Sequence, residues 1–179
     1  MDPQEILKRS TLLRSASEVE AALERMAEEI TADLGHADPV VVAVMNGGAF
    51  TAVGLCRYFR FRYEFDYVHA TRYGQALEGG LLEWRARPQA SLEGRAVLLV
   101  DDVLDKGTTL AGLLREFRRI GVGELRTAVL VRKRIAAADA RPHVDYFALE
   151  SDDVYLFGCG MDYAGYWRGL PELYACDVS

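Results

Sequence analysis

The chain has 179 residues, of which 50% are hydrophobic and 27% are charged, and these values are typical of one globular domain with a full core. Its net charge of −6 argues against broad binding to nucleic acid or to an acidic membrane, but not against a local site for a small phosphorylated molecule. The three cysteines are far apart, which favours reduced thiols in a cytoplasmic protein. No signal peptide or membrane-spanning run is predicted.

The pattern of apolar residues predicts alternating helices and strands. Helical spacing predicts a first helix over residues 17–35, with Ser17 and Glu20 as its capping box. In chain order, the later predicted elements are a strand over 39–45, a helix over 49–59, strands over 61–74, 81–88 and 95–103, a helix over 108–120, and strands over 125–133 and 144–150.

This alternation predicts an α/β fold with a parallel central sheet and helices on both faces. We expect a single domain over residues 1–179 with a core of about 36–150. Residues 74–80 are glycine-rich and are predicted to form a loop. The segment from about 151 onward is aromatic and irregular, which is typical of a lid or small subdomain.

The most informative stretch is VLLVDDVLDKGTTL, residues 97–110. It places Asp101, Asp102 and Asp105 at the carboxyl end of a buried strand, where ligands bind in open α/β sheets. Residues 107–109 then begin a helix, whose free backbone N–H groups can bind an anion. Because carboxylates repel phosphate, they need sugar hydroxyls or a hard cation such as Mg²⁺ as partners. A ribose 5-phosphate would satisfy the whole loop, whereas a simple acidic helix cap would explain only the two adjacent acids.

The whole stretch resembles the phosphoribosyl-pyrophosphate motif of type I phosphoribosyltransferases, and the resemblance covers roughly residues 40–179. It implies the fold of that family, with a small hood built from the N-terminal segment and about residues 151–179. It also implies Mg²⁺ as cofactor, held by Asp101, Asp102 and Asp162. The residues implied to bind phosphoribosyl pyrophosphate are Asp101, Asp102, Asp105, Lys106, Gly107, Thr108 and Thr109, of which Lys106 replaces the usual serine or threonine.

The position of Asp105 separates the subfamilies. In enzymes for 6-oxopurines an acid here is thought to take the proton from purine N7, which makes Asp105 the implied catalytic base. Lys133, at the end of a predicted strand, would donate to purine O6. Tyr155 would stack on the purine, Leu156 would present backbone groups to its edge, and Asp162 would lie by the purine and a second Mg²⁺.

Two further segments are implied to bind pyrophosphate. In VMNGG, Asn46, Gly47 and the following glycine would offer backbone donors to the anion, and Arg168 would bind it from the C-terminal segment. Family members often hold a non-proline cis peptide bond at the place of Met45–Asn46.

The segment TRYG, residues 71–74, resembles the start of the family's flexible catalytic loop. Arg72 and Tyr73 are its implied functional residues, although Arg72 stands where serine is usual. The loop would close over the site and exclude water.

The resemblance implies a purine-salvage enzyme that converts hypoxanthine or guanine and phosphoribosyl pyrophosphate to IMP or GMP and pyrophosphate, usually as a homodimer or homotetramer. A xanthine-guanine enzyme shares the acid at Asp105, but the ending at residues 161–170 fits it less well. An RNA-binding regulator on the same fold stays an alternative, against which the acidic net charge and Asp105 speak. A binding module without turnover is the third alternative, and the intact acids and Lys133 argue against it.

Overall fold

The computed structural model describes residues 2–72, 82–135 and 141–176, so Tyr73 and the predicted glycine-rich loop lie outside the described residues. In chain order the helices and strands are α1 (Pro3–Arg9), β1 (Thr11–Arg14), α2 (Ala16–Leu34), β2 (Val40–Val44), α3 (Gly48–Cys56), β3 (Glu64–Arg72), β4 (Leu82–Ala86), β5 (Ala96–Leu104), α4 (Thr108–Ile120), β6 (Glu124–Arg134), β7 (Tyr146–Asp152), β8 (Tyr155–Phe157) and β9 (Leu173–Cys176). Every element predicted between residues 17 and 150 is therefore confirmed, with ends shifted by a few residues. Among the described helices, none is long and apolar enough to cross a membrane.

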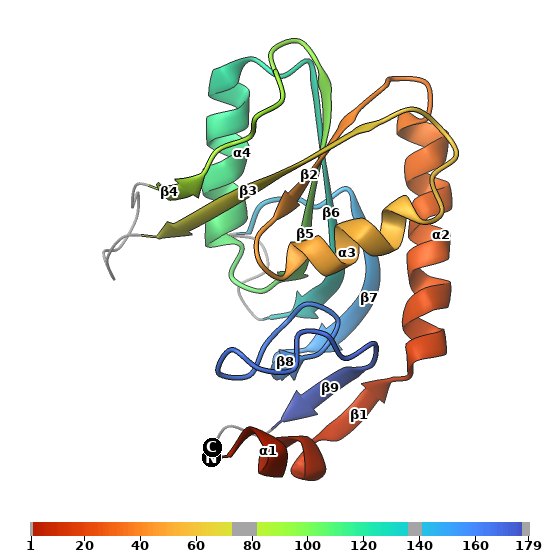
Figure 1. Ribbon diagram of the computed structural model, residues 1–179, viewed down its shortest axis with the longest axis vertical. Coiled ribbons are helices and arrows are strands. Elements are labelled where there is room, and N and C mark those ends of the chain that lie inside the picture. The colour runs from red at the N-terminus through yellow and green to blue at the C-terminus, as the bar shows by residue number, and fades with distance from the viewer. Residues whose placement is uncertain (1, 73–81, 136–140, 177–179) are drawn as a thin grey trace.

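The main sheet has six strands in the order β4-β3-β2-β5-β6-β7 (Figure 1). All neighbouring pairs are parallel except β3 and β4, which are antiparallel. The predicted α/β fold is thus confirmed. Residues 97–100 of β5 are fully buried, as expected for a central strand covered on both faces.

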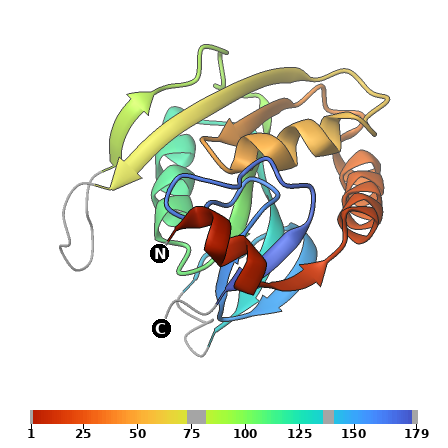
Figure 2. The same ribbon diagram turned by 60° about the horizontal axis from the view of Figure 1, so that its bottom comes forward.

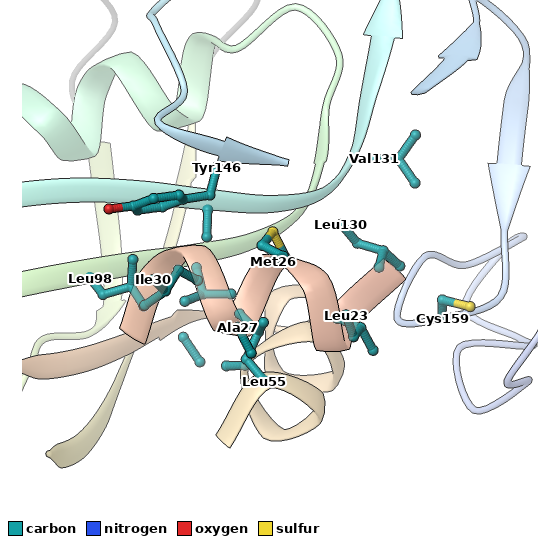
Figure 3. Packing of buried hydrophobic residues seen from close by; sticks show 14 of the residues in the cluster. Leu23, Met26, Ala27, Ile30, Leu55, Leu98, Leu130, Val131, Tyr146 and Cys159 are labelled. Atoms are coloured by element: carbon teal, nitrogen blue, oxygen red, sulfur yellow. The ribbon is translucent and has the colours of Figure 1, made fainter. Parts of the chain in front are cut away.

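Helices cover both faces of this sheet, with α2 and α3 on one side and α4 on the other (Figure 1). Successive side chains of a strand point to opposite faces, so Leu98 and Val100 pack on the side of α2 and α3, and Val97 and Leu99 pack on the side of α4. Figure 3 shows the apolar stripe of α2 lying along the strands of the first side. Because both faces of β5 are buried, the position of this strand is fixed. Asp101 and Asp102 at its carboxyl end are therefore held in place as well.

The capping box of α2 lies two residues earlier than predicted. Ser15 is the N-cap; its hydroxyl accepts from the Glu18 backbone N–H, and its own N–H donates to the Glu18 carboxylate at 2.8 Å. The prediction of Ser17 and Glu20 was wrong. Ser15 and Glu18 have the same three-residue spacing, so the sequence pattern alone did not distinguish the two pairs. β1 ends at Arg14, so the helix begins at the earlier pair.

A second, small sheet joins the two ends of the chain in the order β1-β9-β8. Helix α1 packs on it through Ile6, which clusters with Phe157, and the Trp167 indole N–H donates to the Pro3 carbonyl at 2.9 Å. Figure 2 shows α1 lying across this part of the molecule. The small sheet lies where the hood is predicted, and the division of the chain into core and hood stays a prediction.

Candidate active site

The site lies where the carboxyl ends of β5 and β6 approach the small sheet (Figure 1). The parallel register pairs Asp101 with Val129 and Leu104 with Arg132. Asp105 therefore follows the last paired residue of β5, and Lys133 follows its partner on β6. Two functional side chains that are 28 positions apart in sequence thus leave the sheet at the same level.

A cavity of about 210 Å³ opens at this point. Its lining residues are Asp102, Val103, Asp105, Lys133, Tyr155, Leu156, Met161 and Asp162. Six of these eight are predicted site residues, so the structure brings the predicted purine-binding set together. Val103 and Met161 were not predicted, because apolar residues inside a motif give no signal of their own beyond adjacency to Asp102 and Asp162.

Lys133 is the buried cation of this cavity, with a residue exposure of 9%. Its Nζ lies 3.8 Å from Asp105 Oδ2 and 3.5 Å from Asp153 Oδ1. A carboxylate and an ammonium group on one cavity wall offer a ligand one strong acceptor and one strong donor. The sequence did not predict that Asp153 lies beside Lys133. Asp153 is one of several acids at the end of β7 and after it, and no pattern distinguishes it from the others.

Asp101 and Asp102 form an adjacent acid pair. Asp101 Oδ1 accepts from the Asp102 N–H at 2.9 Å, and Asp102 Oδ1 accepts from the Val103 N–H at 2.8 Å. Burial and the neighbouring Asp102 charge raise the pKa of Asp101 well above its ordinary value. Burial also raises the pKa of Asp102, while hydrogen bonds and the nearby Arg168 charge oppose that rise. The two carboxylates therefore resist ionising together in the free protein, and a cation or hydroxyl donors as partners would stabilise their charged form.

This acid pair fits Mg²⁺. Mg²⁺ is commonly bound by one or two carboxylates together with substrate oxygens, and the described residues contain no cluster of three or more acidic, histidine or cysteine ligands. Asp101 and Asp102 would hold the ion, which supplies charge neutralisation for a departing phosphate group. Any further oxygens would come from the substrate and from water.

Replacing Asp101 by asparagine should stabilise the free protein. An acid whose pKa is raised by folding lowers stability progressively as the pH rises from its ordinary pKa to the raised one, and the full penalty remains above that value. Asp101→Asn removes this penalty and keeps the acceptor for the Asp102 N–H. We expect a melting temperature at pH 8 higher by about 3 °C or more, and a difference that shrinks toward pH 4. Thermal unfolding followed by circular dichroism measures this, and a variant less stable than wild type at pH 8 would contradict it.

The predicted pyrophosphate loop packs directly against the acids. A Cβ atom on Gly47 would overlap the Asp102 carboxylate, and one on Gly48 would lie 2.5 Å from the Val100 carbonyl oxygen. Gly160, with φ +103°, lies against the Gly47 carbonyl from the other side. The Met45–Asn46 peptide bond is cis, as the resemblance implies. A side chain at position 47 would displace the Asp102 carboxylate, so glycine there lets the backbone lie beside the acid pair.

The N-terminus of α4 is open for an anion. Gly107 is its N-cap with φ +69°, and no side chain caps the first turn. The Ala111 N–H donates to the Gly107 carbonyl, so the N–H groups of residues 108–110 remain for a ligand. Thr108 is exposed and Thr109 half-buried, and both begin the helix. This geometry suits a phosphate group at the predicted place.

Lys106 is exposed beside this turn. We expect Lys106→Thr to change the dissociation constant for phosphoribosyl pyrophosphate by no more than about threefold, because an exposed charge contributes little in water. Isothermal titration at two salt concentrations measures this. A loss of affinity of tenfold or more would show that the lysine contacts the phosphate.

The C-terminal part of the site is a hydrogen-bonded loop. Arg168 Nη2 lies 2.5 Å from Asp162 Oδ1, and Arg168 Nη1 donates to the Gly160 carbonyl. The Asp162 carboxylate also accepts from the Gly165 N–H, and its carbonyl accepts from the Tyr155 hydroxyl at 3.0 Å. Burial and the Asp162 charge raise the pKa of Tyr155, so its hydroxyl stays protonated and can donate. The loop therefore fixes Tyr155 and Arg168 relative to Asp162.

The contacts described above do not include Arg72 or Asn46, and Tyr73 lies outside the described residues. Arg72 is the last residue of β3 and pairs with Leu82 of β4. Asn46 is exposed next to the glycine loop. Their predicted roles stay predictions.

The mostly parallel open sheet, the acid pair at the end of its central strand and the uncapped helix after it form a site of the class suited to a phosphorylated ribose. The family model described as "Phosphoribosyl transferase domain" matches residues 12–164. The chain belongs to this family.

Several relatives are similar to the chain over most of their own length. The chain is 26% identical over 162 residues to the hypoxanthine-guanine-xanthine phosphoribosyltransferase of Tritrichomonas foetus, covering 90% of this chain and 88% of that protein. It is 28% identical over 169 residues to the hypoxanthine-guanine phosphoribosyltransferase of Aquifex aeolicus, covering 93% and 94%. The solved hypoxanthine phosphoribosyltransferase of Staphylococcus aureus has the same fold, with a TM-score of 0.88 at 20% identity and coverage of 99% and 96%.

Proposed function

We propose that this chain transfers the phosphoribosyl group from phosphoribosyl pyrophosphate to hypoxanthine or guanine in purine salvage. The products would be IMP or GMP and pyrophosphate. Family membership supports phosphoribosyl transfer, and the names of the relatives support a 6-oxopurine as the acceptor.

One observation carries the choice of base. Asp105 and Lys133 lie 3.8 Å apart and line the same cavity as Tyr155. A 6-oxopurine presents a carbonyl oxygen at C6 next to a ring nitrogen at N7. A lysine donor suits the oxygen and a carboxylate acceptor suits an N7–H, whereas the 6-amino group of adenine would oppose a donor to the lysine.

The reaction forms a bond between purine N9 and the anomeric carbon of ribose while the bond from that carbon to the pyrophosphate oxygen breaks. The purine must lose a proton, and the Asp105 carboxylate would accept it from N7. Asp101 and Asp102 would accept hydrogen bonds from the ribose hydroxyls, and their charge would stabilise positive charge on the ring. The N-terminus of α4 would hold the 5-phosphate.

The leaving group would be held on its other side. The Gly47 backbone and Arg168 would bind pyrophosphate, with Asp162 fixing the arginine through their 2.5 Å ion pair. Asp101 and Asp102 would hold Mg²⁺, which would supply positive charge to offset that of the pyrophosphate.

A spectrophotometric turnover assay tests the proposal, with phosphoribosyl pyrophosphate, Mg²⁺ and each of hypoxanthine, guanine, xanthine and adenine. Turnover of hypoxanthine and guanine, with adenine inert, is the expected result. Xanthine as the best substrate would favour a xanthine-guanine enzyme. A folded protein that converts none of the four would overturn the proposal and direct the next test to RNA binding.

The proposal includes a homodimer or homotetramer. One face of the molecule carries exposed large apolar side chains on α3 and β3, namely Phe50, Val53, Phe65 and Tyr67, each at least 43% exposed. Such a face is typical of a contact between subunits. Light scattering during size-exclusion chromatography measures the assembly, and a monomer at micromolar concentration would contradict this part.

A further inference from the structure

We propose that Arg141, with Pro142 beside it, is a positioning residue that holds the Asp105 loop in register with Lys133. The inference rests on the proposed function, because it assigns these two side chains to the purine. Arg141 does not line the 210 Å³ cavity. It acts on Asp105 and Lys133 through their backbone carbonyl groups.

The first observation is a set of three hydrogen bonds. Arg141 Nη1 donates to the carbonyl oxygens of Leu104 at 3.2 Å, Asp105 at 3.2 Å and Lys133 at 2.8 Å. One guanidinium nitrogen thus joins the end of β5 to the end of β6. Two of the three carbonyls belong to Asp105 and Lys133 themselves.

The place of these carbonyls explains why a donor is needed there. The parallel ladder between β5 and β6 ends at the pair of Leu104 and Arg132. Beyond it β5 leaves the sheet, and the carbonyls at this point lose the N–H groups that a continued ladder would supply. A buried carbonyl without a hydrogen-bond donor lowers the stability of the fold. The Arg141 guanidinium supplies the donors that a neighbouring strand would otherwise provide.

The second observation comes from Pro142. A Cβ atom on Gly107 would lie 2.7 Å from Pro142 Cδ, so the proline ring lies directly against the turn that begins α4. The side chain of Arg141 and the ring of Pro142 therefore hold the loop from Leu104 to Gly107 at both ends. A rigid second layer of this kind keeps reacting groups in position.

The surroundings allow a selective test. Arg141 and Pro142 also line a second cavity of about 470 Å³, which Lys133 lines as well. Within the described part of the chain, the buried Arg141 Nε has no hydrogen-bond partner. A small cation can therefore reach the space that truncation of the side chain would leave.

The experiment compares Arg141→Ala and Arg141→Lys with Arg134→Ala as matched control. Arg134 is an arginine of β6 that also lines the larger cavity, but its side chain is 57% exposed and pairs with Asp152 at 2.8 Å. We expect Arg141→Ala to lower kcat with guanine by about 10- to 100-fold, as small displacements of reacting groups do. Arg141→Lys should keep part of the rate, and Arg134→Ala should stay within about twofold. Millimolar guanidinium, but not urea, should partly restore Arg141→Ala alone.

Hydrogen exchange of the backbone amides of residues 104–109 gives a readout that does not depend on activity. Exchange there should be faster in Arg141→Ala than in wild type, while exchange in α2 stays the same. The inference is overturned if folded Arg141→Ala has the kcat and the amide exchange rates of wild type. It is also overturned if the loss of rate only reflects a smaller amount of folded protein.

If Arg141→Ala does not fold, Arg141→Lys supports the same comparison. If wild type converts no purine, the proposed function fails, and the exchange rates still decide whether Arg141 holds the loop.

Discussion

Asp105→Asn should lower kcat with hypoxanthine and guanine by about a hundredfold or more. The amide keeps the size and the acceptor oxygen of the carboxylate but does not take up a proton, and loss of an acid-base group commonly costs this much. Affinity for phosphoribosyl pyrophosphate should stay within a few-fold, because the acid pair and the α4 N-terminus are untouched. Steady-state kinetics and isothermal titration of the same preparation measure both quantities.

Asp153→Asn is the matched control for this variant. Asp105 and Asp153 both lie within 4 Å of Lys133 Nζ, but only Asp105 lines the cavity. The control should keep kcat within about threefold, since the Asp153 side chain is 64% exposed. An equal loss of kcat in the two variants would mean that the rate depends on negative charge beside Lys133 and not on proton transfer to Asp105.

Lys133→Met should remove most of the discrimination between 6-oxopurines and adenine. Methionine fills the space of the lysine stem and deletes the donor to purine O6. A hydrogen bond from a charged group contributes about 1.5–3 kcal/mol, so kcat/KM for guanine should fall by at least about tenfold while that for adenine does not fall. The ratio of the two kcat/KM values, measured in the same assay, is the test.

Lys106→Thr serves as control for Lys133→Met, because it removes an exposed lysine from the neighbouring loop and should leave the ratio unchanged. An unchanged ratio in folded Lys133→Met would show that O6 is recognised by another group. The backbone of Leu156, which lines the same cavity, is then the next candidate.

The sequence predicted the local structure around the candidate site well where that structure depends on contiguous residues. The stretch from Asp101 to Thr109 contains a strand end, a turn and a helix start, and each has a local pattern of its own. The positions of Lys133 and Tyr155 followed from the resemblance, and the structure places both at the cavity next to Asp105.

Features that depend on distant contacts were not predicted. Helix α1 has seven residues and β1 has four, lengths at which local preferences are weak. Both elements depend on partners more than 150 positions away, since Trp167 bonds to Pro3 and β1 pairs with β9. Arg141 was missed for a similar reason. Its partners are backbone carbonyls, which any sequence provides, so no residue pattern marks the contact.

A crystal structure of the wild-type chain with bound GMP tests the central claim most directly, because that claim concerns which atoms meet the purine. The account predicts the purine in the 210 Å³ cavity against Tyr155. Asp105 should lie within about 3.2 Å of N7 and Lys133 Nζ within about 3.2 Å of O6. A purine bound outside this cavity, or one whose N7 and O6 contact other residues, would contradict it.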